Sequence, residues 1–104
     1  MRTTVVNVKH ETCDLYIGRA FAGRPESKWH NPYRIGLDGT REEVIAKYAR
    51  DLGKKIVENP ELLDEILAMH GKRLGCWCAP EACHGDILAH IADLIIPEIP
   101  SDTT

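Results

Sequence analysis

Arg73-Leu-Gly-Cys-Trp-Cys-Ala-Pro-Glu-Ala-Cys-His-Gly-Asp-Ile87 is the stretch of the chain that says most about its fold. It contains three of the four cysteines of the sequence. An apolar segment precedes these cysteines and a helical pattern follows them, which predicts a strand, a tight loop and a helix start. Ligands and reactive groups of α/β proteins often lie at such junctions, because strand ends and free helix N–H groups meet there.

Further strands are predicted on the N-terminal side of this stretch. Residues 3–9 are rich in β-branched side chains and predict a first strand. Residues 14–17 predict either a short second strand or an extended loop. Residues 73–78 predict the last strand, and we expect it to lie next to the first strand and parallel to it.

Three helices are predicted from their start signals and apolar spacing. A capping-box pattern that begins at Thr40 predicts a helix from Arg41. Asn59 and Pro60 predict a second helix, with asparagine as its N-cap and proline at its first position. The final helix is predicted over residues 85–94, and Pro97 and Pro100 should follow its end.

The order strand, loop, two helices, strand, helix predicts a small single-domain α/β fold. We expect a mainly parallel sheet with flanking helices, similar in style to a Rossmann fold. The chain of 104 residues has the size of one domain. The domain should span residues 1–96, and residues 97–104 should be a frayed tail. Residues 19–39 show no regular spacing of apolar side chains, which predicts a long ordered loop of functional importance.

Composition narrows the class of protein. A net charge of −3 argues against a wholly basic protein that coats nucleic acid. No apolar run approaches the ~18 residues of a membrane span, and the N-terminus lacks the apolar core of a signal peptide. We therefore expect a cytoplasmic protein without a membrane partner. In that compartment its cysteines should be thiols or ligands rather than disulfides.

One interpretation of the cysteines is a metal site. Cys76 and Cys78 would share one face of the last strand, and Cys83 and His84 would stand at the start of the next helix. Three thiols and an imidazole can bind zinc tetrahedrally. The spacing Cys-x-Cys-x4-Cys-His differs from that of a zinc ribbon, and adjacent ligands rarely reach one ion together. Other candidates for the fourth ligand are Cys13 and His10.

A second interpretation is a thiol nucleophile. Cys78 is followed by five residues and a helix start, as in cysteine phosphatases and rhodanese-like enzymes. Phosphatases place an arginine where this chain has His84. Pro80 removes an N–H donor and Glu81 adds a negative charge, and both changes weaken a phosphate-binding loop.

A third interpretation is a ligand pocket at the helix N-terminus. Gly85 would allow close approach of the backbone, His84 would form hydrogen bonds, and Asp86 would bind a hydroxyl or a base edge. A nucleotide or sugar phosphate would suit these groups. The purely structural alternative makes Cys76 a small buried core residue and Asp86 a cap of the helix.

The long loop adds candidates for ligand binding. Its arginines Arg19, Arg24 and Arg34 offer forked donors that match phosphate, and Arg19 is the strongest candidate because it directly follows a predicted strand end. Trp29 and Tyr33 would either stack on a base or anchor the core.

Three segments together resemble a known family: Val5-Val-Asn-Val8, Tyr16-Ile-Gly-Arg19 with Trp29-His-Asn-Pro-Tyr33, and residues 71–86 with Cys-Trp-Cys-x4-Cys-His-Gly-Asp. The chain is similar, over residues 4–95, to the small bacterial and phage family catalogued as domain of unknown function 4326. His30 and Tyr33 differ from its usual Trp-Gly-Asn-Pro-Phe pattern. The resemblance implies one constellation of residues, made of Asn7, Tyr16, Gly18, Arg19, Trp29, Asn31, Pro32, Cys76, Cys78, Cys83, His84, Gly85 and Asp86.

Our leading hypothesis is a nucleotide-like or nucleic-acid ligand at the carboxyl ends of the first and last strands. Arg19 would contact phosphate, and Asn7 or Asn31 a base or ribose. His84 would act as general acid/base, and Asp86 would orient the ligand. The full set of ligand-binding candidates is Asn7, Arg19, Trp29, Asn31 and Gly85.

Other functions stay open at this point. The chain would be a hydrolase or transferase acting on a nucleotide-like substrate, or a binding protein without catalysis. The competing hypothesis is a structural or regulatory zinc module that uses Cys76, Cys78 and Cys83. A third possibility is a phage protein that interacts with a host factor.

Overall fold

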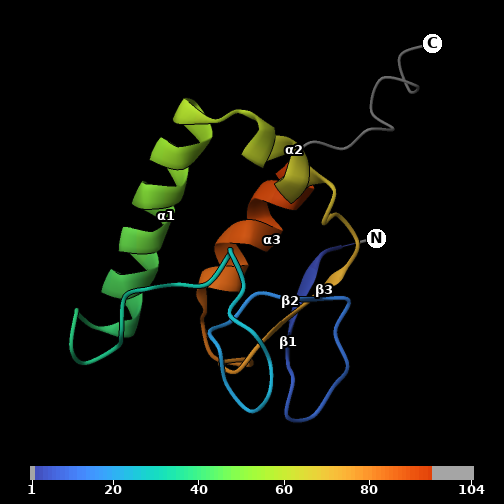
Figure 1. The fold of residues 1–104 in the computed structure, drawn as a ribbon, viewed down its shortest axis with the longest axis vertical. Helices are drawn as coiled ribbons and strands as arrows, with labels where there is room; N and C mark the ends of the chain where they lie inside the picture. Colours follow the sequence, from blue (N-terminus) through green and yellow to red (C-terminus); the bar gives the residue numbers. More distant parts are fainter. Residues whose placement is uncertain (1, 95–104) are drawn as a thin grey trace.

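The structure of the protein is a computed structural model that describes residues 2–94. Its elements occur in the predicted order (Figure 1). The predicted tail, with Pro97 and Pro100, lies outside the described residues. The elements are β1 (Thr4–Asn7), β2 (Leu15–Tyr16), α1 (Arg41–Glu58), α2 (Glu61–Leu67), β3 (Arg73–Cys76) and α3 (His84–Leu94).

The three strands form one parallel sheet with β3 in the centre, in the order β1-β3-β2. Asn7 at the end of β1 lies opposite Cys76 at the end of β3, so both carboxyl ends reach the same edge. Leu74 of β3 is fully buried. The prediction that the first and last strands are parallel neighbours in an α/β fold is confirmed.

The strand that contains Cys76 is shorter than predicted, because it ends there and not at Cys78. Its partner β1 ends at Asn7, where the chain turns and the N–H groups of His10 and Glu11 donate to the Asn7 carbonyl. Beyond this point β3 has no neighbouring strand to pair with. The carbonyl groups of the following residues accept from the Asn7 side chain instead.

Helix α1 begins at Arg41, as its capping box predicts. The Thr40 hydroxyl accepts from the N–H of Glu43, and the Glu43 carboxylate accepts from the N–H of Thr40 at 2.8 Å. These two bonds satisfy backbone donors that the first turn of a helix leaves free. The face that α1 buries consists of Val44, Tyr48 and Leu52.

The predicted N-cap of the second helix was wrong. Pro60, not Asn59, precedes α2, and no side chain caps that helix. Asn59 instead ends α1, since its N–H donates to the Lys55 carbonyl at 2.8 Å. Asn59 has φ and ψ of −139° and 86°, outside the helical region, and its backbone N–H closes the preceding helix.

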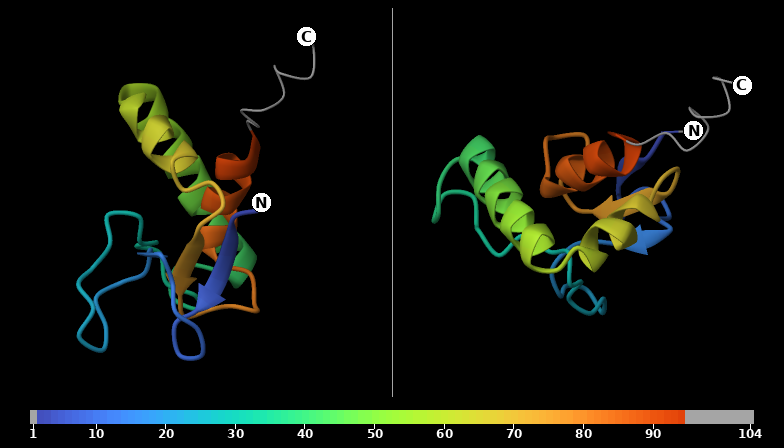
Figure 2. Two further views of the ribbon diagram at one scale, coloured as in Figure 1. Left: turned by 90° about the vertical axis from the view of Figure 1, so that its right-hand side faces the viewer. Right: turned by 90° about the horizontal axis from the view of Figure 1, so that it is seen from above.

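Helix α3 lies between α1 and the sheet (Figure 1). It contacts β1 and β3, whereas α1 packs against α3 and α2. The largest fully buried side chains sit where these layers meet: Ile17, Ile66, Leu74 and Leu88. The segment between β2 and α1 extends to one side of the sheet (Figure 2). No helix within residues 2–94 has the length and apolarity to cross a membrane.

A network of hydrogen bonds connects three segments near the starts of β1 and β3, at the end of the sheet opposite Asn7 and Cys76. The Asp93 carboxylate near the end of α3 accepts from the N–H of Thr3 at 3.0 Å and from its hydroxyl at 2.7 Å. His70 Nδ1 lies 2.7 Å from the same carboxylate, and the N–H of Gly71 donates to the Thr3 hydroxyl. These contacts connect the start of β1, the segment after α2 and the end of α3.

Candidate functional site

A cavity of about 640 Å³ opens at the carboxyl end of β3, where the sequence predicts a ligand site. Its walls come from the segment after β2, the start of α1 and the loop between β3 and α3. This volume lies within the range of about 300–1,000 Å³ that is typical of small-molecule sites. The parallel sheet brings these segments together, because all its strands end at one edge.

Three thiols form a cluster in this wall. The Sγ atoms of Cys76, Cys78 and Cys83 all lie within 4.8 Å of one another, and those of Cys76 and Cys83 are 3.2 Å apart. Cys76 ends β3, Cys78 lies two residues beyond it, and Cys83 directly precedes α3. All three cysteines are free thiols and line the cavity. The three cysteines that the metal-site interpretation names therefore lie close together, and their role as metal ligands stays a prediction.

The thiols influence one another's ionisation. Hydrogen bonds from Cys76 and Cys83, and the nearby Arg41 guanidinium, lower the pKa of Cys78 well below its ordinary value. Hydrogen bonds with Cys76 and Cys78, together with burial, raise the pKa of Cys83. The hydrogen bond to Cys78 likewise raises the pKa of Cys76.

His84 is a buried neutral imidazole beside this cluster. Its Nε2 lies 2.8 Å from the Ile17 carbonyl, and because a carbonyl only accepts, Nε2 carries the proton. Nδ1 then faces Cys83 Sγ at 3.4 Å. Burial lowers the pKa of His84, although the hydrogen bond to Ile17 partly opposes this effect. The ring packs edge-on against Tyr48, with centroids 4.9 Å apart. Its role as general acid/base stays a prediction.

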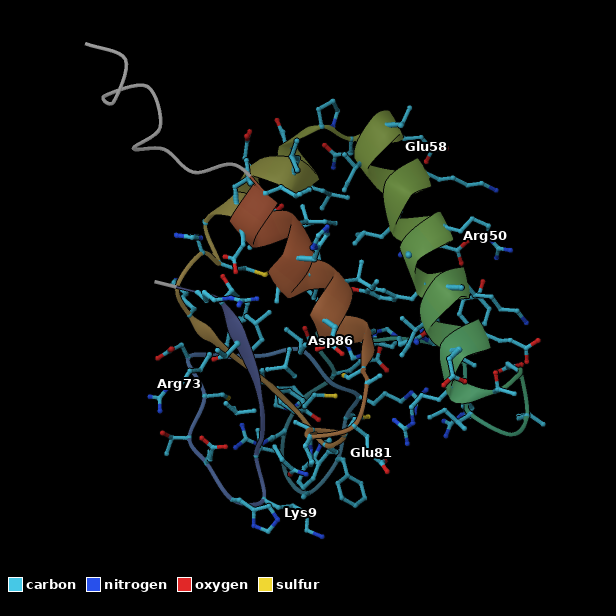
Figure 3. The ribbon with its side chains drawn as sticks, turned by 180° about the vertical axis from the view of Figure 1, so that it is seen from behind. Lys9, Arg50, Glu58, Arg73, Glu81 and Asp86 are labelled. Atoms are coloured by element: carbon cyan, nitrogen blue, oxygen red, sulfur yellow. The ribbon has the colours of Figure 1, made fainter. Side chains whose placement is uncertain are left out.

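Asp86 caps the helix, as the structural alternative predicts. Its Oδ2 accepts from the N–H of Cys83 at 3.0 Å, and its side chain projects from the first turn of α3 (Figure 3). Asp86 lies outside the lining of the cavity. The catalytic or ligand-orienting role of Asp86 stays a prediction without a contact to the cavity.

Gly85 packs the helix against the sheet. A Cβ atom at this position would lie 2.6 Å from Ile17 Cδ1 and 3.1 Å from Val5 Cγ2. Its N–H points to Cys83 Sγ at 3.4 Å. The absence of a side chain therefore serves close packing of α3, and Gly85 itself does not line the cavity.

Two of the three arginines of the long loop line the cavity, and they differ in their hydrogen bonds. Arg19 donates from Nε to the Asn31 carbonyl at 3.0 Å and from Nη2 to the Tyr33 carbonyl at 2.7 Å. These bonds hold two parts of the loop together and leave three of its five donors. Arg34 also lines the cavity, and its guanidinium has no hydrogen-bond partner within residues 2–94.

Three predicted ligand residues have structural contacts. The Asn7 amide donates to the Trp77 and Ala79 carbonyls at 3.1 and 3.0 Å. The Asn31 amide donates to the Val44 carbonyl, and its oxygen accepts from Tyr33. Trp29 is only 6% exposed and belongs to the core. Of Asn7, Asn31 and Trp29, Asn31 alone lines the cavity.

An aromatic pair forms a wall that sequence reasoning missed. The rings of Phe21 and Trp77 meet edge-to-face with centroids 5.1 Å apart, and the Phe21 side chain is 63% exposed. Trp77 Nε1 donates to the Tyr16 hydroxyl at 2.7 Å, which fixes the indole. Trp77 stands inside the cysteine-rich stretch and could have been found there. Phe21 lies in the unpatterned loop and carries no such signal.

Arg41 was also missed, because its position predicts only a helix start. It donates from Nη1 to the Ala82 carbonyl and from Nη2 to Glu81, both at 2.8 Å. Among the described residues that line the cavity there are three arginines and no aspartate or glutamate. The cavity wall thus carries arginines in a chain whose net charge is −3, and Glu81 pairs with one of them, Arg41.

Together these features define a class: a small α/β protein with a parallel sheet and a cysteine-lined cavity at its strand ends. The family described as "Domain of unknown function (DUF4326)" matches residues 2–94, and the chain belongs to this family. The resemblance seen in the sequence is therefore confirmed.

Two viral relatives accompany this match. An uncharacterised protein of Acanthamoeba polyphaga mimivirus is 33% identical over 97 residues, which cover 82% of this chain and 71% of the relative. An uncharacterised 12.4 kDa protein of Enterobacteria phage T4, from the nrdA-td intergenic region, is 35% identical over 65 residues. That match covers 62% of this chain and 60% of the phage protein, less than two thirds of its length. No solved structure matches the chain.

Proposed function

We propose that this protein binds a nucleotide-like ligand, an anion that carries a planar ring, in the cavity at the end of β3. The observation that carries the proposal is the composition of the wall. Arg19, Arg34 and Arg41 line it together with Phe21 and Trp77. Cationic and aromatic groups on one wall match the two chemical parts of a nucleotide.

The anionic part would lie against the arginines. Arg34 is exposed and has no protein partner within residues 2–94, so binding a phosphate would break no existing contact. Arg19 keeps donors beyond the two that it uses. An arginine and a phosphate can form two parallel hydrogen bonds, which are stronger than bonds between neutral groups. This supports Arg19 in the phosphate-binding role that the sequence suggests and adds Arg34.

The planar part would lie against Phe21 and Trp77. The stacking of one base on an aromatic side chain contributes about 1–3 kcal/mol. Phe21 is exposed and Trp77 is partly exposed, so both have ring surface to offer. We assign the stacking role to this pair in place of Trp29, whose ring is buried in the core.

The first test measures binding of nucleoside mono-, di- and triphosphates by isothermal titration calorimetry. Replacing Arg34 by alanine (Arg34→Ala) should weaken binding by roughly tenfold or more, because a charge-assisted hydrogen bond contributes about 1.5–3 kcal/mol. Phe21→Ala should weaken binding of nucleotides but not of inorganic phosphate, since it removes stacking alone.

Arg73→Ala is the matched control. Arg73 is half-exposed at the start of β3, pairs with Asp14 and does not line the cavity (Figure 3). The substitution removes the same charge as Arg34→Ala and should leave the affinity nearly unchanged. Equal losses in the two variants, or no binding of any nucleotide by the folded protein, would refute the proposal. Turnover is a separate prediction, checked by chromatography of each nucleotide after incubation with the protein.

A further inference from the structure

We propose that Cys76, Cys78 and Cys83 bind one zinc ion as three thiolates, with a fourth coordination position open to the cavity. The three-thiolate site goes beyond the proposed function and does not depend on it. Only the identity of the fourth ligand rests on that function, since a phosphate oxygen of the nucleotide would take this position in place of water.

The spacing of the sulfurs fits a single ion. Zinc–sulfur bonds of about 2.3 Å at tetrahedral angles set the sulfurs about 3.8 Å apart. The Sγ atoms of Cys76 and Cys83 are 3.2 Å apart, and all three Sγ atoms lie within 4.8 Å of one another, so small shifts of the side chains would bring them to this spacing. An iron–sulfur cluster would require wider spacing, because its thiolates bind different iron atoms.

The loop that carries the thiols is held in place by contacts outside the cluster. On one side the Asn7 amide binds the carbonyl groups of Trp77 and Ala79. On the other side Arg41 binds the Ala82 carbonyl and the Glu81 carboxylate. Both sides of the loop are therefore fixed, and ligands that are already in place lose little conformational freedom on binding an ion.

Surrounding groups favour the thiolate form of the ligands. The N–H of Gly85 points to Cys83 Sγ, and Cys83 stands at the N-terminus of α3, where the helix dipole stabilises negative charge. Arg41 lines the cavity beside Cys78. Three thiolates and one Zn²⁺ carry a net charge of −1, and the guanidinium, although paired with Glu81, adds positive charge near it. Binding releases the thiol protons to the solvent and involves no oxidation or reduction.

The fourth position is open because no other described side chain completes the group. The donor atoms that converge within residues 2–94 are the three sulfurs alone. His84 Nδ1 lies 3.4 Å from Cys83 Sγ, but contacts with Ile17 and Tyr48 hold its ring, and it is not among the donor atoms that converge with the three sulfurs. A zinc site with three protein ligands and one open position is typical of sites that bind water or substrate.

Cys13 does not belong to the cluster, and it provides the control. A Cβ atom on Gly75 would lie 2.5 Å from Cys13 Sγ. Because neighbouring residues of a strand point to opposite faces, Cys13 lies on the face of β3 opposite to Cys76. Cys13 also lies outside the cavity lining.

The experiment measures zinc content in the full chain, purified anaerobically without tags or chelators and then supplied with zinc salt and dialysed. Inductively coupled plasma mass spectrometry should find about one zinc per chain in the wild type and in Cys13→Ser. Cys78→Ser, which alters the least buried ligand, should lose most of it, and so should Cys83→Ser. Circular dichroism verifies that each variant is folded. Cobalt should give thiolate charge-transfer absorption in the wild type, and Cys78→Ser should weaken it.

Three results would overturn the proposal. The first is metal-free wild-type protein with four titratable thiols after exposure to zinc. The second is a disulfide between Cys76 and Cys83, with two thiols remaining. The third is bound iron with acid-labile sulfide. Nucleotide titrations of the zinc-loaded and zinc-free protein separate the two proposals. Zinc without nucleotide binding refutes the proposed function alone, and nucleotide binding without zinc refutes the metal site alone.

Discussion

At Gly85 the lack of a side chain sets how closely α3 approaches the sheet. The nearest atoms to a Cβ at this position belong to Ile17 and Val5, which are part of or packed against the core. Any added methyl group must displace them. The glycine stands directly after His84, so its packing also sets the position of the imidazole next to the cysteines.

We predict that Gly85→Ala destabilises the fold by about 1–3 kcal/mol, because it overpacks a filled core. Gly53→Ala is the matched control, since Gly53 lies exposed in α1 with no atom within 4 Å of an added Cβ. It should stabilise the protein by about 0.5–1 kcal/mol, because alanine favours the helix. Urea unfolding monitored by circular dichroism measures both. A neutral Gly85→Ala would contradict the packing account.

Predicting the site from the sequence succeeded where its residues are close in the chain and was limited where they are distant. The cysteines converge within one loop, so their spacing indicated the cluster. Gly85 was interpreted as a point of ligand approach, because close packing and ligand contact both require the absence of Cβ. Arg41 and Phe21 reach the cavity through tertiary contacts that no local pattern encodes.

At the scale of elements, Asp93 joins the end of α3 to the start of β1. Burial raises the pKa of Asp93, but hydrogen bonds from Thr3 and His70 outweigh this effect and hold the pKa below its ordinary value. A carboxyl group whose folded pKa is depressed stabilises the fold above its unfolded pKa. That stability is lost as the pH falls through the folded pKa.

We therefore predict that the free energy of unfolding falls between about pH 5 and pH 2, and that it falls less steeply in Asp93→Asn. Other carboxyl groups with lowered pKa, Glu43 and Asp51, affect both proteins equally. The difference between the two pH profiles thus isolates Asp93. Urea unfolding at several pH values gives the profiles, and identical slopes would contradict the role of this network.

The ends of the helices and strands show which sequence patterns depend on neighbouring residues alone. The capping box of α1 depends on residues three positions apart, and its prediction was confirmed. The end of β3 depends on where β1 turns, some 70 residues earlier in the chain, so the strand was predicted too long. The Asn59 side chain is of a type that often caps the start of a helix, but the Asn59 backbone N–H instead closes the end of α1. Which of the two occurs depends on where α1 ends.

At the scale of the whole molecule, β3 is the centre around which the other layers are arranged. It pairs with β1 on one side and β2 on the other, and α3 packs against it. By contrast, α1 lies beside α3 and α2 rather than beside a strand, and its last turns carry the exposed Val57. The stability of the molecule should therefore be unevenly distributed.

We predict that the amides of Leu74 to Cys76 are the slowest to exchange with deuterium, since they open only when the sheet does. Amides in the last two turns of α1 should exchange much faster. Hydrogen-exchange mass spectrometry or NMR measures both sets in one sample. Equal protection of the two regions would show that the chain opens as a single unit.

The pairing of β1 with β3 has a consequence for how the chain folds as it leaves the ribosome. The N-terminal strand emerges first, yet its hydrogen-bonding partner starts only at Arg73. Until then the nascent chain can form α1 but no sheet, because β2 also pairs with β3. Such distant pairing is typical of slow folding. The thiol loop follows β3 directly in the chain, so its cysteines cannot take their places beside the sheet before β3 has been made and has paired with β1.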